Sequence, residues 1–140
     1  MISKVSNTPL TYRSITAADY DDVRLFLASV GWERRVADPE RFDVMMDEAD
    51  RTVVALDGNR IVGFGRALCD GVSNGYISMV AVAEDRRRQG IGREMVSRLM
   101  AGDTEGRITW VLRAGRGSQE FWERVGFRVS AIAMERVRRS

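Results

Sequence analysis

The chain has 140 residues, of which 44% are hydrophobic and 30% charged, the composition of a folded domain rather than a disordered protein. Basic residues outnumber acidic ones by only 22 to 20, and this net charge of +2 gives weak support to nucleic-acid binding. The absence of histidine and the single cysteine, Cys69, exclude Ser-His-Asp triads, internal disulfides and multi-cysteine metal sites.

The first part of the chain predicts a strand and two helices. Residues 10–15 read as a short strand, and Thr16 with Asp19 has the spacing of a helix-capping box. Apolar residues then recur at helical spacing until Gly31 ends the run. Asp38 followed by proline is typical of the start of a second helix.

The middle of the chain predicts a hairpin, another strand and a third helix. The apolar segments 52–56 and 61–68 flank the turn sequence 57–59, Asp-Gly-Asn, which favours a β-hairpin. Residues 76–82 form the next predicted strand, and a helix with one apolar stripe follows Gly90.

The last part predicts a strand over 108–112 and a helix that Ser118 begins and Gly126 ends. Residues 127–137 are expected to add a final strand or two. This order predicts a mixed α/β (α+β) sheet with one crossover through the segment at Gly90.

The turn between strand 76–82 and the following helix carries the clearest chemical signal. The first N–H groups of a helix have no internal partner and lie at the positive end of its dipole. Gly90 and Gly92 leave those amides uncovered, and three arginines add positive charge beside them: Arg87, Arg88 and Arg93. This arrangement predicts a cradle for a diphosphate.

Other interpretations of the turn are weaker. No Gly-Lys-Ser/Thr sequence is present, which excludes a Walker A motif, and Gly90-x-Gly92-x-x-Met95 lacks the third small residue of a dinucleotide-binding fingerprint. A tight strand-to-helix turn that binds nothing is the remaining alternative.

The spacing Arg87-x-x-Gly90-x-Gly92 after a Val-x-Val strand resembles the R/Q-x-x-G-x-G/A signature of the GNAT superfamily of acyl-CoA-dependent N-acyltransferases. The segment 121–127, Phe-Trp-Glu-Arg-Val-Gly-Phe, is similar to the F-Y-x-x-x-G-F segment of that family. The inferred order of elements agrees with the family along essentially the whole chain.

This resemblance implies one domain over residues 1–140, with a mostly antiparallel sheet of six or seven strands, about four helices and splayed parallel fourth and fifth strands. It also implies acetyl-CoA as co-substrate, with its pyrophosphate on the glycine turn and its pantetheine arm beside the fourth strand. The implied binding residues are Val80, Ala81, Val82, Arg87, Arg88, Gln89, Gly90, Ile91, Gly92, Arg93 and Phe121.

The catalytic residues cannot be copied from the family. Trp122 stands where many members have a tyrosine that protonates the CoA thiolate, and Ser78 and Met79 occupy the strand on which some members carry a glutamate base. A water-mediated base at Glu33 or Asp70 is the alternative, so the catalytic residues are left unassigned.

Several residues also have an ordinary structural interpretation. Phe121, Trp122 and Val125 are more often core than site, and Cys69 is expected to be a small buried hydrophobic side chain. Residues 32–35, Trp-Glu-Arg-Arg, follow the first helix, where family members line the acceptor pocket. If they do so here, their arginines favour an acceptor bearing a carboxylate or phosphate.

We therefore expect an N-acetyltransferase that transfers an acetyl group from acetyl-CoA to a primary amine of a small molecule or peptide. The alternatives are an acyl-CoA-binding module without catalysis and, less favoured, a nucleic-acid-binding protein. The sequence predicts no metal and no nucleic-acid partner. It also predicts no membrane partner, because no apolar run approaches about 20 residues. Residues 1–5 lack signal-peptide features, which favours the cytoplasm, and a homodimer is possible without being required.

Overall fold

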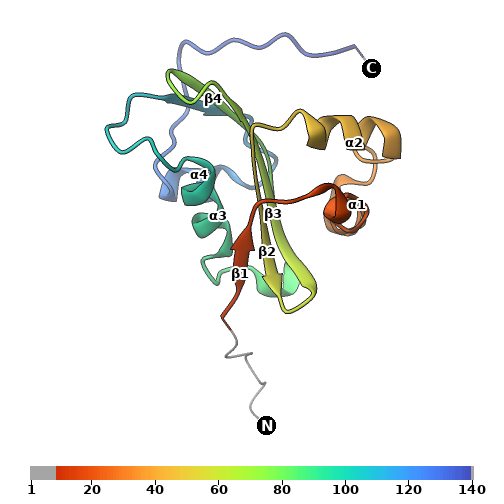
Figure 1. The fold of residues 1–140 in the computed structure, drawn as a ribbon. Helices are drawn as coiled ribbons and strands as arrows, with labels where there is room; N and C mark the ends of the chain where they lie inside the picture. The colour runs from red at the N-terminus through yellow and green to blue at the C-terminus, as the bar shows by residue number, and fades with distance from the viewer. Residues whose placement is uncertain (1–8, 140) are drawn as a thin grey trace.

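A computed structural model describes residues 9–139 as one five-stranded sheet with helices on both faces (Figure 1). Residues 1–5, on which the signal-peptide prediction rests, lie outside the described part. Between residues 9 and 139, no helix combines the length and the hydrophobicity needed to cross a membrane.

The sheet has the order β1-β2-β3-β4-β5, in which neighbours in the chain are also neighbours in space. Pairing is antiparallel from β1 to β4 and parallel between β4 and β5, so the predicted mixed sheet is confirmed. The strands are β1 (Thr11–Arg13), β2 (Arg51–Asp57), β3 (Arg60–Cys69), β4 (Asn74–Val82) and β5 (Thr109–Leu112).

Helices cover the two faces in pairs: α1 (Tyr20–Leu27) and α2 (Pro39–Asp47) on one side, α3 (Ile91–Leu99) and α4 (Gln119–Arg124) on the other (Figure 1). Each face has its own hydrophobic core. One core joins Phe64 and Met79 to the first pair of helices, and the other joins Val62 and Ile77 to the second.

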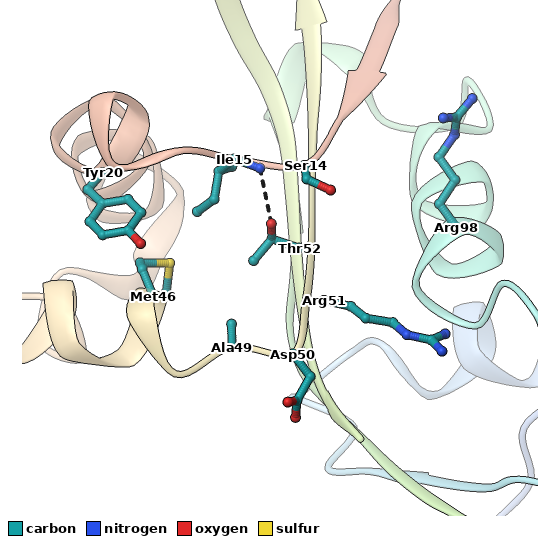
Figure 2. A pocket seen from close by; sticks show the side chains of 9 residues that line it. All are labelled: Ser14, Ile15, Tyr20, Met46, Ala49, Asp50, Arg51, Thr52 and Arg98. Carbon is teal, nitrogen blue, oxygen red and sulfur yellow. Dashed lines mark hydrogen bonds between the residues drawn. The ribbon is translucent and has the colours of Figure 1, made fainter. Parts of the chain in front are cut away.

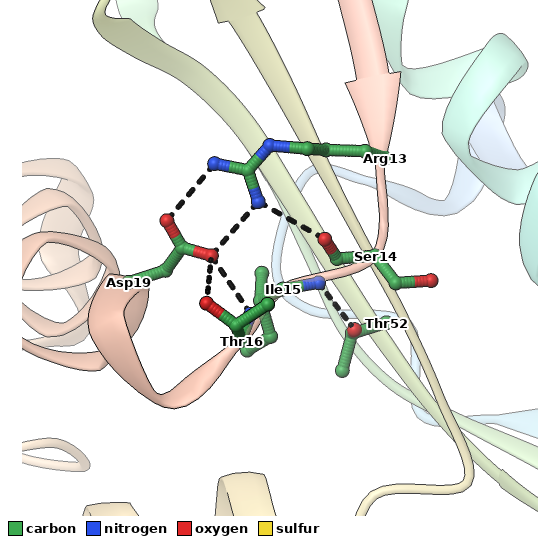
Figure 3. Close-up of polar contacts among 6 residues, drawn as sticks. All are labelled: Arg13, Ser14, Ile15, Thr16, Asp19 and Thr52. Carbon is green, nitrogen blue, oxygen red and sulfur yellow. Dashed lines mark hydrogen bonds and ion pairs between the residues drawn. The ribbon is translucent and has the colours of Figure 1, made fainter.

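The entry into α1 follows the predicted capping pattern. The backbone N–H of Thr16 donates to the Asp19 carboxylate at 2.8 Å, and Arg13 forms two bonds to the same carboxylate, at 2.8 and 3.0 Å (Figure 3). The N–H of Ile15 donates to Thr52 Oγ1 at 3.1 Å, which attaches this segment to β2. The α-helix itself ends at Leu27, and a wider helical turn, η2 (Ala28–Trp32), continues to the region of Gly31.

The start of α2 is also as predicted. One carboxylate oxygen of Asp38 accepts from the N–H groups of Glu40 and Arg41, at 3.1 and 3.2 Å, and Pro39 occupies the first helical position. Such a cap satisfies amide groups that have no partner inside the helix.

The prediction of one or two strands over residues 127–137 was wrong. The chain after α4 contains no helix or strand up to residue 139, so the described sheet has five strands rather than six or seven. Its apolar residues do not alternate strictly, so no single face of a strand could bury them all. They are exposed instead: Val129, Ile132, Met134 and Val137.

Candidate functional site

Strand β5 is shorter than β4 and pairs with only its first half. They pair only from Asn74 with Thr109 to Ile77 with Leu112, and no pairing with β5 follows along residues 78–82. Among residues 9–139, the second half of β4 therefore has one free edge, and we call the space beside it the gap. The parallel pairing of these two strands confirms that prediction, whereas their splaying stays a prediction because β5 ends at Leu112.

The backbone of β4 offers hydrogen-bonding groups to that free edge. The N–H of Ala83 donates to the carbonyl of Val62 at 2.8 Å, and Ala81 lies opposite Phe64, so these residues point towards β3. Because orientation alternates along a strand, the amide and carbonyl groups of Val80 and Val82 point away from β3 and into the gap. An extended ligand can therefore pair with β4 there.

A β-bulge directly follows the last residue of β4 that pairs with β5. Arg66 of β3 faces Met79, whereas Ala67 faces Ile77, so Ser78 is the extra residue on β4. Met79 packs with the α1–α2 core, and the Ser78 hydroxyl accepts a bond from Arg66, which also contacts α2. Consequently, Ser78 and Met79 both face the α1–α2 side of the sheet.

The turn after β4 presents an unbroken run of free backbone amides. It contains η3 (Glu84–Arg86), and both Arg88 and Gly90 have positive φ angles, of 66° and 83°. No acceptor within residues 9–139 takes a hydrogen bond from the backbone N–H of any residue between Arg87 and Arg93. A Cβ added at Gly90 would meet no atom within 4 Å, so these amides are open to a ligand.

The arginines around the turn have different surroundings. The Arg93 guanidinium donates to the carbonyl of Arg124 at 3.2 Å and so ties α3 to the end of α4. Arg86 forms an ion pair with Asp57, whereas Arg87 and Arg88 are exposed. Arg87 also lines a hollow of about 640 Å³ between the turn and residues 26–31. Charge near the free amides therefore comes from Arg87 and Arg88.

Phe121 of α4 lies directly against the turn. A Cβ on Gly92 would lie 3.0 Å from two atoms of its ring, so glycine at position 92 lets the two helices approach this closely without a shift of the ring. Trp122 is only 8% exposed and packs edge-to-face against Phe121 and Phe127, with ring centroids 5.0 and 5.4 Å apart. The core interpretation of Trp122 is confirmed.

The structure does not support Asp70 as a base. Its carboxylate accepts hydrogen bonds from the backbone of Val72, Ser73 and Asn74 and from the Ser73 hydroxyl, at 2.6 to 3.1 Å. These bonds, led by those of Ser73, hold the pKa of Asp70 far below its ordinary value. Asp70 therefore stabilises the loop between β3 and β4. Glu33 is exposed in the turn after η2.

A second hollow, of about 270 Å³, lies at the opposite edge of the sheet. Figure 2 shows it between the ends of β1 and β2, the end of α2 and the α3 side chain Arg98. Since β1 and β2 are separated from the β4–β5 gap by β3, this hollow is distinct from the free edge of β4. Over residues 9–139, no group of three or more side chains is suited to hold a metal ion.

The sequence analysis missed Arg66. This residue is 7% exposed and lies on β3 beside the bulge, where it contacts the residue that precedes Met79. Its signal in the sequence was a charged residue in the middle of the apolar run 61–68.

The family model of the acetyltransferase (GNAT) domain matches residues 48–129, which is more than half of the chain and includes the turn, the gap and Phe121. The chain belongs to the GNAT family. No curated protein matches it.

Solved acetyltransferase structures share the fold at low sequence identity. A GNAT-family acetyltransferase from Streptococcus pneumoniae TIGR4 is 21% identical to this chain, with a TM-score of 0.73. The match covers 94% of this chain and 100% of that protein's chain. An acetyltransferase from Trypanosoma brucei is 20% identical with a TM-score of 0.70, covering 92% and 99%. An aminoglycoside acetyltransferase from an uncultured soil sample, in complex with sisomicin, is 17% identical with a TM-score of 0.67, covering 93% and 97%.

Proposed function

We propose that this GNAT protein is an N-acetyltransferase that moves an acetyl group from acetyl-CoA to the primary amine of a small molecule or peptide. The observation that supports it most strongly is the run of free backbone amides between Arg87 and Arg93, next to the free edge of β4. Amides at a helix start suit a diphosphate, and an open strand edge suits an extended arm with amide groups.

The residues of the gap fit this ligand without any metal. Residues 87–93 would hold the pyrophosphate, Val80 and Val82 would pair with the amides of the arm, and Phe121 would lie beside it. Acetyl-CoA supplies an activated thioester that an amine can attack directly. The N–H of Val80 is the donor placed to stabilise negative charge on the thioester oxygen.

The departing thiolate needs no acid from the protein for this chemistry. A thiol has an ordinary pKa near 8.5, so its anion leaves without protonation more readily than an alkoxide would. Trp122 has no acidic group to offer and packs in the core. The acceptor amine would lose its proton to water, with exposed Glu33 as the remaining water-mediated base, since Asp70 is tied to the loop before β4.

The test uses two substitutions at Gly90 that differ in charge alone. Asn and Asp tolerate positive φ better than other residues, and nothing lies within 4 Å of a Cβ there, so both should cost a similar stability, about 1 kcal/mol. Gly90→Asp places a carboxylate beside the diphosphate and should weaken acetyl-CoA binding at least about tenfold more than Gly90→Asn does. Calorimetric titration with acetyl-CoA measures both.

Two results would contradict the proposal. Equal affinities of the Asp and Asn variants would reject the location of the pyrophosphate, and absence of acetyl-CoA binding by the unchanged protein would reject the function. Binding without release of CoA thiol across a panel of amines would instead favour the non-catalytic module, for which the buried Trp122 is the supporting observation.

A further inference from the structure

Arg66 is a buried cation without an ionic partner. It is 7% exposed, and its guanidinium donates from Nε to the carbonyl of Met45 at 3.2 Å and from Nη1 to Ser78 Oγ at 2.7 Å. Throughout residues 9–139 no carboxylate lies within 4.0 Å of it. Burying a charge without a counterion costs free energy, so the Arg66 guanidinium at this position is not explained by stability alone.

The third nitrogen of the guanidinium is available to a ligand. Nη2 has no hydrogen bond to any described residue, yet it does not belong to the enclosed polar atoms that lack a partner. It therefore reaches solvent from an otherwise buried side chain. Two fixed bonds hold the guanidinium in place and leave one donor directed outward.

The position of Arg66 relates it to the reaction site. Its partner Ser78 is the bulge residue of β4, two residues before Val80, and Arg66 lies opposite Met79 on the α1–α2 side. Phe121 and Gly92 lie on the other side of the sheet, with α3 and α4. An amine that approaches the gap from the α1–α2 side would therefore pass close to Arg66.

Groups of both charges lie near Arg66, but none in the described part of the chain is an ion-pair partner. Arg35, whose guanidinium lies 4.9 Å from the centre of the Trp32 ring, adds a second positive charge from the segment after α1. Burial lowers the pKa of Arg66, the negative charge of Asp50 acts against this effect, and the smaller contribution of Arg35 acts in the same direction as burial. The Asp50 carboxylate accepts from the N–H of Cys69 at 2.7 Å and lies beyond ion-pair distance.

We propose that Arg66, assisted by Arg35, binds a carboxylate of the acceptor, so that the acceptor is a small amine that also carries a carboxylate, such as an amino acid. This inference rests on the proposed function and names the substrate class for the same site. A planar guanidinium with a free donor matches a carboxylate, and the two positive charges disfavour a polycationic acceptor such as an aminoglycoside.

The experiment compares α-amino acids with their α-amides, which keep the amine and lose the negative charge. For the best amino acid, kcat/KM should exceed that of its amide at least about tenfold, because charge-assisted hydrogen bonds are the strong ones. Arg66→Met should abolish this preference while leaving acetyl-CoA affinity within about twofold. Arg66→Lys, which keeps the charge, should retain part of the preference, and Arg41→Met, an exposed site on α2, should retain it all.

A purely structural role of Arg66 predicts a different result. Loss of its bonds to Met45 and Ser78 would then lower the melting temperature and reduce the rates with amino acid and amide alike. An unchanged ratio in Arg66→Met would therefore overturn the proposal. Should Arg66→Met fail to fold, the ratio in Arg66→Lys decides: a reduced ratio supports the proposal and an unchanged ratio overturns it, because a lysine cannot keep the bonds to Met45 and Ser78 and also place a donor where Nη2 lies.

Binding separates this inference from the proposed function. Protein loaded with coenzyme A is titrated calorimetrically with each amino acid, its amide, an aminophosphonate and sisomicin. Selective binding of the amino acids that Arg66→Met abolishes supports the inference even if no acetyl transfer occurs. Tighter binding of the aminophosphonate than of the amino acids would overturn the inference and assign a phosphate-type acceptor. Equal binding of amino acids and their amides, or binding of sisomicin alone, would also overturn the inference.

Discussion

Glycines determine how closely other elements approach β3 and β4. A Cβ at Gly63 or Gly65 would come within 2.9 Å of side chains of α3, and a Cβ at Gly75 would come within 2.3 Å of the Trp110 ring. The ends of Met95 and Leu99 could shift to make room at Gly63 and Gly65, but the rigid Trp110 ring makes glycine necessary for reasons of space at Gly75. Gly90 differs, since its requirement is its positive φ.

Gly75→Ala tests the contact that joins β5 to β4. The methyl group would push against the Trp110 ring in a well-packed region, and we expect the free energy of unfolding to fall by about 2 kcal/mol. Acetyl-CoA affinity should fall as well, because β5 supports the first half of β4, and the pantetheine arm would pair with the second half of the same strand. Denaturant unfolding and calorimetry measure the two effects.

A second substitution identifies the cause. In the double variant Gly75→Ala/Trp110→Leu, the clash is removed, so the loss of stability should be clearly smaller than the sum of the two single losses. Additive losses would show that the contact between Gly75 and Trp110 does not limit the pairing of β4 with β5.

The elements illustrate which features a sequence can reveal. Helix starts were predictable, because Asp38 with the following proline and Thr16 with Asp19 act through local hydrogen bonds. The bulge at Ser78 was not, since the chain carries no glycine there, and an alternating apolar pattern reads the same with or without an extra residue. The turn at Gly90 was predictable from its glycines, whereas the single free nitrogen of Arg66 depends on three elements meeting.

The contact between β1 and the start of α1 predicts a dependence of stability on pH. The hydrogen bonds from Arg13, foremost among the causes, lower the pKa of Asp19 to about 2 from the ordinary 3.8. A carboxylate with a lowered pKa stabilises the fold at pH values above its unfolded pKa, and this stabilisation is lost as the pH falls towards 2. Because Arg13 is 43% exposed, solvent screening reduces the stabilisation from this ion pair to about 1 kcal/mol.

Asp19→Asn measures this contribution. We expect the unchanged protein to exceed the variant in free energy of unfolding by about 1 kcal/mol above pH 4, and the two to converge near pH 2. Arg13→Gln, which removes the partner, should reduce the same pH dependence. Urea unfolding at a series of pH values gives the curves, and parallel curves would contradict the role of the ion pair shown in Figure 3.

At the scale of the whole molecule, two halves have different roles. Strands β1 to β3 with α1 and α2 form a continuous antiparallel support, while β4, the turn, α3 and β5 form the free edge and the run of open amides. The predicted fold class followed from the order of elements, which is dictated by hydrophobic periodicity. The resemblance implies six or seven strands, but the described sheet has five, because the apolar residues after α4 are exposed and form no strand.

Removal of residues 128–140 tests whether the segment after α4 belongs to the folded core. Its large apolar side chains are exposed, Met134 by 97% and Ile132 by 89%, and its ion pair between Glu135 and Arg113 lies at the surface. Exposed groups and exposed ion pairs contribute little to stability. We therefore expect the shortened chain to have a free energy of unfolding within about 1 kcal/mol of that of the full chain and to bind acetyl-CoA with similar affinity.

A control that ends before Phe127 should lose more stability, since Phe127 packs against Trp122. A large loss in the first truncation, measured by urea unfolding at low protein concentration, would mean that residues 128–140 pack onto the sheet edge at β5 or onto a second copy. Sedimentation of the full chain at several concentrations then separates those two cases.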